Sequence, residues 1–265
     1  MSDNEQLKML AERIDSHIHL AGKKVLEIGC GNGDLLKLIA ESYDIAHITG
    51  VDSSLSGWWG IGESVGANWS VCDGNAERLC FDDNSFDAVI SYAAFEHIEN
   101  VKLALSEIKR VMKPYGRFYT EFSPIWTSIV GHHFVAKDET LFNPSHLKLI
   151  PPWGHLYMNE LQMHDHLHEQ TEEDALIDEI LYFIYHSSII NRLGRNDFLD
   201  IIVNCGMIIK MYQETIAFNR LAILGMEKAS ELTADILKKI VSAGYDATDI
   251  GVLSMMVLLE KYESI

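Results

Sequence analysis

The chain has 265 residues, 48% of them hydrophobic, and a formal net charge of −18 at pH 7, so it can bury a substantial core but repels nucleic-acid phosphates. Its four cysteines have no paired spacing, which excludes a disulfide framework or a zinc motif and favours a reduced, cytoplasmic protein. The amino terminus is polar and no apolar run approaches the roughly 20 residues that span a bilayer, so neither secretion nor a membrane partner is expected.

The first informative element is a short apolar strand that ends in a glycine-rich turn. Residues 25–33 read Val-Leu-Glu-Ile-Gly-Cys-Gly-Asn-Gly, which places Gly29, Gly31 and Gly33 at alternate positions. Glycine lets the backbone turn sharply and approach a ligand closely. The apolar positions after Asp34 predict a helix whose N-terminal amides face that ligand.

Glu27 separates this turn from the dinucleotide-binding fingerprint G-x-G-x-x-G. The spacing here is G-x-G-x-G, and Asp34 stands where the third glycine of the fingerprint would be. A carboxylate two residues before the first glycine suits a ligand with a cationic amino group and repels a pyrophosphate. An NAD-dependent dehydrogenase therefore conflicts with the pattern.

Further strands are predicted along the first half of the chain, at 47–51, 68–72, 86–92 and 117–122. Asp52 follows the first of them, where it can accept hydrogen bonds from both hydroxyls of a ribose. Asp73 follows the next and can accept from an exocyclic amine such as that of adenine. A helix is predicted at 101–112, ended by Pro114 and Gly116, and its basic residues are interpreted as solvated surface.

Taken together, these motifs resemble the class I S-adenosylmethionine (SAM) dependent methyltransferases, in the broad group called methyltransferase type 11. The resemblance covers residues 23–122 and rests on the motifs at 25–33, 50–54, 72–76, 86–91 with Glu96-His97, and 107–117. It implies a Rossmann-like α/β fold with a seven-stranded, mostly parallel sheet of strand order 3-2-1-4-5-7-6. It also implies SAM as the cofactor and S-adenosylhomocysteine (SAH) as its product.

The same resemblance implies roles for single residues. The cofactor-binding set is Glu27, Gly29, Gly31 and Gly33 at the turn, Asp52 and Ser53 at the ribose, Asp73, Gly74 and Asn75 at the adenine, and Ser91 and Tyr92 beside the transferred methyl. Trp58 and Trp59 are a further pair that can cover the adenine, although tryptophans near a core usually serve packing.

After residue 122 the chain changes character. About 80 residues separate the fifth strand from the next predicted strand at 207–212, where such connections normally have about 2–6 residues. An insertion of this length usually forms a lid or a substrate site. We therefore expect an N-terminal helical segment at 1–22, a SAM-binding core at 23–122, a helical substrate-binding lid at 123–205 and the rest of the core sheet at 206–265. Within the last two, helices are predicted at 172–200 and 231–243 and a final strand at 251–259.

The predicted lid is rich in histidine, with His132, His133, His146, His155, His164, His166 and His168. One interpretation is a metal site, although on a helix only His164 and His168 share a face. The other is that one histidine is the general base for an acceptor hydroxyl, since histidine titrates near neutral pH. We favour the second interpretation and expect no bound metal.

His132 and His133 are the first candidates for the base, because they follow the fifth strand near the edge of the sheet where ligands bind. The resemblance adds that many small-molecule methyltransferases carry Gly-His-His at this point. His97 and His155 come next, and a structural role for each histidine stays open.

The expected reaction is methyl transfer to a small molecule, at a hydroxyl oxygen of a sugar or secondary metabolite. Methylation at nitrogen or carbon and a non-catalytic SAM-binding module are the alternatives. The oligomeric state is open, with a homodimer as one alternative.

Overall fold

The computed structural model describes residues 3–55, 60, 62–134, 149–216 and 234–263, and it divides the chain into two compact units. We call the first the core unit; it comprises Met1–Phe122, Asp200–Gln213 and Met256–Ile265. The second, the insertion unit, comprises Ser123–Leu199 and Glu214–Met255. Residues 214–255, which the sequence analysis grouped with the core sheet, thus fall in the insertion unit. Trp58, Trp59 and His146 lie outside the described residues.

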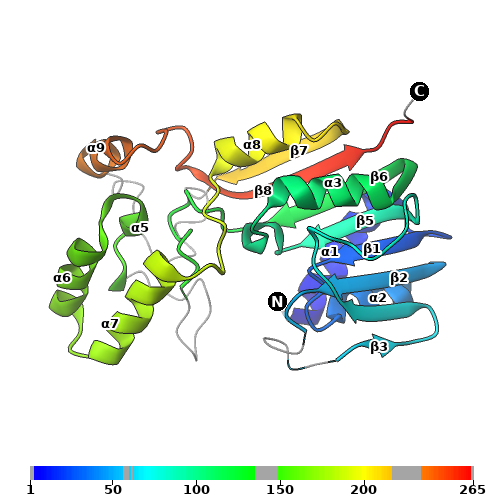
Figure 1. Cartoon of the computed structure of the whole chain (residues 1–265), viewed down its shortest axis with the longest axis horizontal. Helices are drawn as coiled ribbons and strands as arrows, with labels where there is room; N and C mark the ends of the chain where they lie inside the picture. The colour runs from blue at the N-terminus through cyan, green and yellow to red at the C-terminus, as the bar shows by residue number, and fades with distance from the viewer. Residues whose placement is uncertain (1–2, 56–59, 61, 135–148, 217–233, 264–265) are drawn as a thin grey trace. The chain divides into compact units, whose positions relative to one another are not determined.

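An eight-stranded sheet organises the fold, in the order β3-β4-β2-β1-β5-β6-β8-β7 (Figure 1). The strands are β1 Lys24–Ile28, β2 His47–Asp52, β3 Ser64–Val65, β4 Trp69–Asp73, β5 Phe86–Tyr92, β6 Met112–Phe122, β7 Ile208–Ile216 and β8 Val252–Glu260. The pairs β1–β2, β1–β5, β2–β4 and β5–β6 are parallel. Without β3, the order is the predicted 3-2-1-4-5-7-6, so the α/β class and this order are confirmed. The strand count is corrected from seven to eight, because the two-residue β3 pairs antiparallel with the outer strand β4.

Helices of the core unit follow the apolar periodicity of the sequence. They are α1 Asp3–Ile18, α2 Asp34–Ser42, the 3₁₀ turn η1 Phe95–His97 and α3 Val101–Val111. In α2 the buried positions are Leu35, Leu36, Ile39 and Ala40, which form one face of a helix. These side chains belong to a cluster with Ile14 of α1 and Val25 of β1. The glycine turn therefore connects a strand and a helix that are both anchored in one core.

β6 differs from its prediction, because it begins at Met112 and not at Arg117. Its pairing with β5 jumps from Phe86–Met112 to Ala88–Arg117, so the residues between Met112 and Arg117 bulge out of the ladder. Pro114 has no N–H to contribute to a ladder, and Tyr115 has a left-handed φ of 63°. The predicted helix stop was right, and the bulge explains why the strand nevertheless starts earlier.

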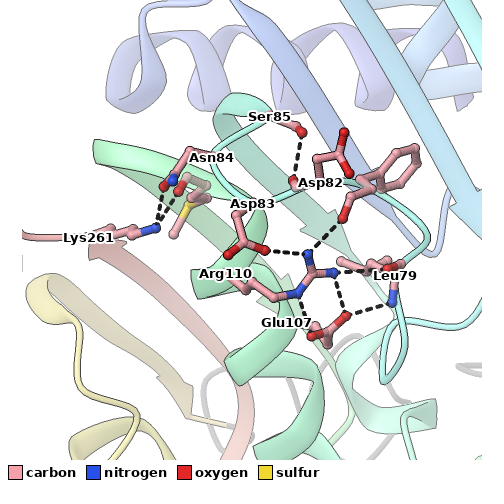
Figure 2. A network of polar contacts seen from close by, with 10 residues as sticks. Leu79, Asp82, Asp83, Asn84, Ser85, Glu107, Arg110 and Lys261 are labelled. Atoms are coloured by element: carbon pink, nitrogen blue, oxygen red, sulfur yellow. Dashed lines mark hydrogen bonds and ion pairs between the residues drawn. The ribbon is translucent and has the colours of Figure 1, made fainter.

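Arg110 holds the loop before β5 to α3, which corrects the interpretation of this one basic residue of the helix as solvated surface, whereas Lys102 is exposed as expected. Its guanidinium donates to both carboxylate oxygens of Glu107 at 2.8 Å, to Asp83 at 2.8 Å, and to the carbonyls of Phe81 at 2.7 Å and Leu79 at 2.9 Å (Figure 2). The hydrogen bonds from Arg110 lower the pKa of Glu107. All five guanidinium donors of Arg110 are thus used inside the fold.

The insertion unit has its own hydrophobic core, with Trp153, Met163, Leu167 and Ile180 among its most buried side chains. Its elements are α5 Gly154–Tyr157, α6 Glu160–Gln170, α7 Asp174–Leu181, the π-helical turn η2 Tyr182–His186 and α9 Ala234–Ser242, while α8 Arg195–Val203 begins here and ends in the core unit.

The helix predicted at 172–200 is thereby corrected to α7, η2 and α8, and it is broken near Arg192, whose φ is 56°. The helix predicted at 231–243 corresponds to α9, its first three residues lying outside the described part. Within the described residues, every helix is too short or too polar to cross a membrane.

Candidate functional site

The glycine turn after β1 adopts a backbone that other residues rarely adopt. Gly29, Gly31 and Gly33 have φ values of 70°, 54° and 81°, all in the left-handed region. A Cβ on Gly29 would lie 2.3 Å from the Cβ of Ala94, so a side chain there has no room. The amides of Gly29 and Cys30 both donate to the carbonyl of Val51, at 2.8 and 3.2 Å. The turn is therefore fixed against the end of β2.

Glu27, the third residue of the turn motif, is buried with only 3% of its surface exposed. Its Oε2 atom is shielded from solvent and has no hydrogen-bond partner among the described residues. Burial, and secondarily the negative charge of Asp52, raise the pKa of Glu27 to about 8. A carboxyl in this position is stabilised in its charged form by a cation that donates a hydrogen bond.

Asp52 ends β2 and is held by two backbone amides. Its Oδ2 accepts from Gly31 N at 3.0 Å, and its Oδ1 accepts from Ser54 N at 2.8 Å. Each carboxylate oxygen keeps a second lone pair, so both can accept again from a neighbouring diol. Ser53, the next residue, is exposed.

The predicted adenine contacts lie beside Asp52, because β4 pairs with β2 in register. Asp73 is the partner of Asp52 across the two strands, and Gly74 N donates to Asp52 O at 3.1 Å. The side chain of Asn75 accepts from Glu77 N at 2.7 Å, which closes the turn. Asp73 and Asn75 are exposed, so both can be reached by a ligand.

The end of β5 contributes Ser91, Tyr92 and the loop with His97. Ser91 is buried and its hydroxyl donates to Ile28 O at 3.0 Å, so it stabilises the ends of β1 and β5. Tyr92 is 41% exposed, and His97 is exposed at the end of η1. Ala94 was not foreseen as part of the site, since a lone alanine carries no sequence signal. Its contact with Gly29 depends on the pairing of β1 with β5.

The structure thus brings the predicted cofactor residues and His97 to one edge of the core unit, at the carboxyl ends of β1, β2, β4 and β5. This is the edge at which parallel α/β sheets bind ligands. The other three candidate bases, His132, His133 and His155, belong to the insertion unit.

His132 and His133 are both buried, but their ring nitrogens have different roles. His132 Nδ1 accepts from the amide of Phe134 at 3.0 Å, so the proton of a neutral His132 ring is on Nε2. His133 Nδ1 lies 2.8 Å from the carbonyl of Gly131, which can only accept, so Nδ1 carries the proton and Nε2 the lone pair. His133 also has a left-handed φ of 56°. Of these two rings, only that of His133 has its lone pair on Nε2, so only its Nε2 can accept a proton.

His155 has the contacts of a packing residue. Its ring lies 4.7 Å from the ring of Trp126 and 5.3 Å from that of His132, both edge to face. Its Nε2 donates to Trp126 O at 2.8 Å. Burial lowers the pKa of His155 to about 4, so the ring is neutral at physiological pH.

Comparisons with known proteins agree with this geometry. Residues 26–120 match the family model described as a methyltransferase domain. Among curated proteins, the ubiquinone/menaquinone biosynthesis C-methyltransferase UbiE of Allorhizobium ampelinum is 31% identical over 161 residues, or 58% of this chain and 59% of that protein. The sterol 24-C-methyltransferase ERG6A of Gibberella zeae is 36% identical over 102 residues, or 37% of this chain and 26% of that protein. The chain therefore spans less than two thirds of the length of either relative.

Solved structures show the same fold. A SAM-dependent methyltransferase from Mesorhizobium loti aligns with a TM-score of 0.54 and 13% sequence identity, over 96% of this chain and 100% of that one. The order of the motifs, the glycine turn and the matched family model together show that residues 26–120 form a methyltransferase domain of the class I type, a family whose cofactor is SAM.

Proposed function

We propose that this chain is an enzyme that transfers a methyl group from SAM to a small-molecule acceptor. The observation that carries the proposal is Glu27, a buried carboxyl with a shielded, unpartnered oxygen beside a left-handed glycine turn. A carboxyl so placed destabilises the folded protein unless a ligand supplies a cationic donor. The ammonium group of the methionine part of SAM is such a donor, so the residues present fit this cofactor.

The remaining cofactor contacts follow from the edge of the core unit. Asp52 would accept from the ribose hydroxyls with the lone pairs that Gly31 and Ser54 leave free. Asp73, Gly74 and Asn75 would contact the adenine, and Tyr92 would lie nearest the reacting group. Gly33, in the left-handed region at the start of α2, completes the turn.

Methyl transfer at this site requires that the acceptor be positioned against the methyl group and that a proton be removed from the acceptor. When bound, SAM supplies an electrophilic methyl group whose transfer is an in-line displacement. The chain's own part is to align the acceptor, exclude water and take up the acceptor's proton. We assign the base to His133, because Nδ1 is committed to Gly131 and the proton-accepting nitrogen is Nε2.

We infer that the acceptor atom is oxygen, with carbon and nitrogen as the alternatives. A hydroxyl oxygen fits a histidine base, which removes the hydroxyl proton as the methyl bond forms. A carbon acceptor is the second candidate, favoured by the two relatives named as C-methyltransferases. Both reactions end with loss of a proton from the acceptor, so His133 has the same task in each.

The cofactor assignment is tested by calorimetric titration of the full chain with SAM, SAH and NAD. We expect SAM and SAH to bind and Glu27→Gln to weaken SAM at least about tenfold, because the neutral amide cannot pair with the ammonium charge. Glu41→Gln, an exposed acid at the end of α2, is the matched control and should bind like the wild type. Tighter binding of NAD than of SAM, or unchanged affinity in Glu27→Gln, would overturn the assignment.

The base and the acceptor are tested by SAH release with a hexose, a catechol and a naphthoquinol, using ¹³C-methyl SAM so that NMR identifies the methylated atom. His133→Gln should lose about 100-fold or more of the turnover while keeping SAM affinity, and His132→Gln should lose less. His97→Gln changes an exposed residue of the core unit, and a larger loss there would move the base to His97. SAM binding with no turnover on any acceptor is the result that a non-catalytic SAM-binding module predicts.

A further inference from the structure

Two histidines outside the site described above converge on the surface of the insertion unit. His164 and His168 lie one turn apart on α6, and their Nε2 atoms are 3.2 Å from each other. Their rings meet edge to face with centroids 4.4 Å apart. Two coordinating nitrogens thus point at one place, which sequence spacing alone indicates only as a shared face.

We propose that His164 and His168 bind a single divalent transition metal ion, of the zinc or nickel type, on α6. Two imidazole nitrogens that ligate one tetrahedral zinc ion, each at about 2.0–2.1 Å, are separated by about 3.3–3.4 Å. The observed 3.2 Å therefore needs almost no rearrangement of the side chains. Imidazole is a preferred ligand of zinc, nickel and copper, whereas magnesium and calcium prefer oxygen.

Asp165 supports this assignment through the other nitrogen of His164. Its Oδ1 lies 3.4 Å from His164 Nδ1, and this contact favours the tautomer that carries its proton on Nδ1. In that tautomer the lone pair is on Nε2, the nitrogen that faces His168. A carboxylate behind a ligating histidine is the arrangement that orients many metal ligands in proteins.

The helix that carries the pair is held rigidly. Asn159 and Gln162 form a reciprocal capping box at its start. Met163 and Leu167, on the adjacent face of the helix, are fully buried in the core of the insertion unit. The side chain of His164 is 43% exposed, so an ion can enter from solvent and water can complete its coordination.

Glu160 lies one turn before His164 and therefore on the same face of α6, where its carboxylate is near the proposed ion. Its Oε1 is paired with His186 Nε2 at 2.9 Å. Glu160 and His164 also line one shallow groove together with Asn159, Leu161 and Leu181. The bis-histidine pair is the binding element, and the acid adds negative charge next to the cation.

The test uses the full chain after treatment with a chelator, titrated with ZnCl₂, NiCl₂ and MgCl₂ at pH 7.5. We expect the histidine pair of each chain to bind one zinc or nickel ion and no magnesium. The affinity for zinc should be at least tenfold weaker in His164→Gln and in His168→Gln. His166→Gln, on the same helix but outside the pair, is the matched control and should bind like the wild type. A zinc affinity that is the same in His168→Gln as in the wild type would overturn the proposal.

Thermal unfolding with and without the ion gives a second measurement that does not depend on counting ions. The ion should raise the melting temperature of the wild type and of His166→Gln, because it binds only the folded helix. It should not raise that of His168→Gln, and an equal rise in both variants would contradict the site. Neither measurement uses methyl transfer, so the result is independent of the proposed function.

Discussion

Glu27, the residue proposed to pair with the ammonium group of SAM, is a buried carboxyl that destabilises the folded protein when it is ionised. Its side chain is buried, its pKa is raised to about 8, and its Oε2 has no partner in the described part of the chain. A raised pKa means that the folded state favours the neutral acid, so ionising it opposes folding. Binding sites often retain such groups because the ligand, and not the protein, supplies the counter-charge.

Glu27→Gln should therefore stabilise the ligand-free protein in a pH-dependent way. Below pH 4.5 the acid is protonated in both the folded and the unfolded chain, and its burial brings no ionisation cost. As the pH rises from 4.5 through about 8, the unfolded chain loses a proton that the folded chain keeps, and the wild type loses up to about 5 kcal/mol. The advantage of Glu27→Gln should grow over this range in urea unfolding experiments.

The exposed Glu41→Gln provides the comparison for this effect, and its free energy of unfolding should follow that of the wild type at every pH. Saturating SAM should reverse the order, because it stabilises the wild type and much less the Glu27→Gln variant. An advantage of Glu27→Gln that stays constant between pH 5 and 8 would show that its pKa is not raised.

Residue types at the turn were predictable, but hydrogen-bond partners were not. The position of Glu27 relative to the glycines follows from the chain itself, since a strand and a turn have fixed geometry, whereas that of Asp52 depends on the pairing of β1 with β2. Sequence reasoning treated His132 and His133 as equivalent. Only the folded backbone, which offers an amide to one ring and a carbonyl to the other, separates them.

At the scale of the element, two side chains tie α3 to the loop before β5: Glu107 accepts from Leu79 N at 2.9 Å, and Arg110 makes the other bonds. Arg110 reaches Asp83, 27 residues before it, and Leu79, 31 residues before it (Figure 2). The side chain is only 30% exposed, so these bonds are partly shielded from water. Because the loop leads directly into β5, the network positions the strand that ends at Ser91 and Tyr92.

Arg110→Lys should lower the free energy of unfolding by about 1–3 kcal/mol, although the charge is conserved. An ammonium group cannot replace the planar fork, so the carbonyls of Leu79 and Phe81 lose their donor. Chemical denaturation measures the change. Arg78→Lys, at an exposed arginine nearby, is the matched control with little expected effect, and an equal loss in both variants would contradict the role of the network.

The extent of α3 could be predicted from its apolar period and its proline stop, and the observed helix ends one residue earlier than expected. The role of its basic face could not be predicted, because the partners come from a distant loop. The same holds for β6, whose bulge depends on pairing with β5. Local periodicity identifies an element, whereas its partners are set by contacts between elements.

At the scale of the whole molecule, the chain forms two compact units, and each has a hydrophobic core of its own. Their ionisable groups respond to pH in opposite directions. Burial of Glu27 in the core unit disfavours the charged acid, while burial of His155 in the insertion unit disfavours the charged ring. The free energy of unfolding of the core unit and that of the insertion unit therefore depend on pH in different ways, and one value does not describe both.

Acid should destabilise the insertion unit through His155. The lowered pKa means that the unfolded chain binds a proton below pH 6.5 while the folded chain resists it until about pH 4. The contribution of the neutral ring is present above pH 6.5 and declines by about 3 kcal/mol as the pH falls to 4. Hydrogen exchange with mass spectrometry, read on peptides from 149–170, should show this loss in the wild type.

In His155→Gln, which keeps a donor for Trp126 O, the amide protection of these peptides should no longer depend on the titration of residue 155. Peptides of the core unit from the same samples are the internal reference, since the substitution should leave them unchanged. A wild-type pH dependence that persists unaltered in His155→Gln would show that another group is responsible.

The sequence by itself determined the methyltransferase core, its strand order and which residues are proposed to contact the cofactor. The motifs are runs of a few consecutive residues, and the strand order came from the family resemblance that those motifs carry. The tertiary structure alone decided that Nδ1 of His133 lies against a backbone carbonyl, that Arg110 is hydrogen-bonded to a distant loop, and that His164 and His168 converge. Those properties depend on distances between side chains and on shielding from water, which spacing along a chain does not contain.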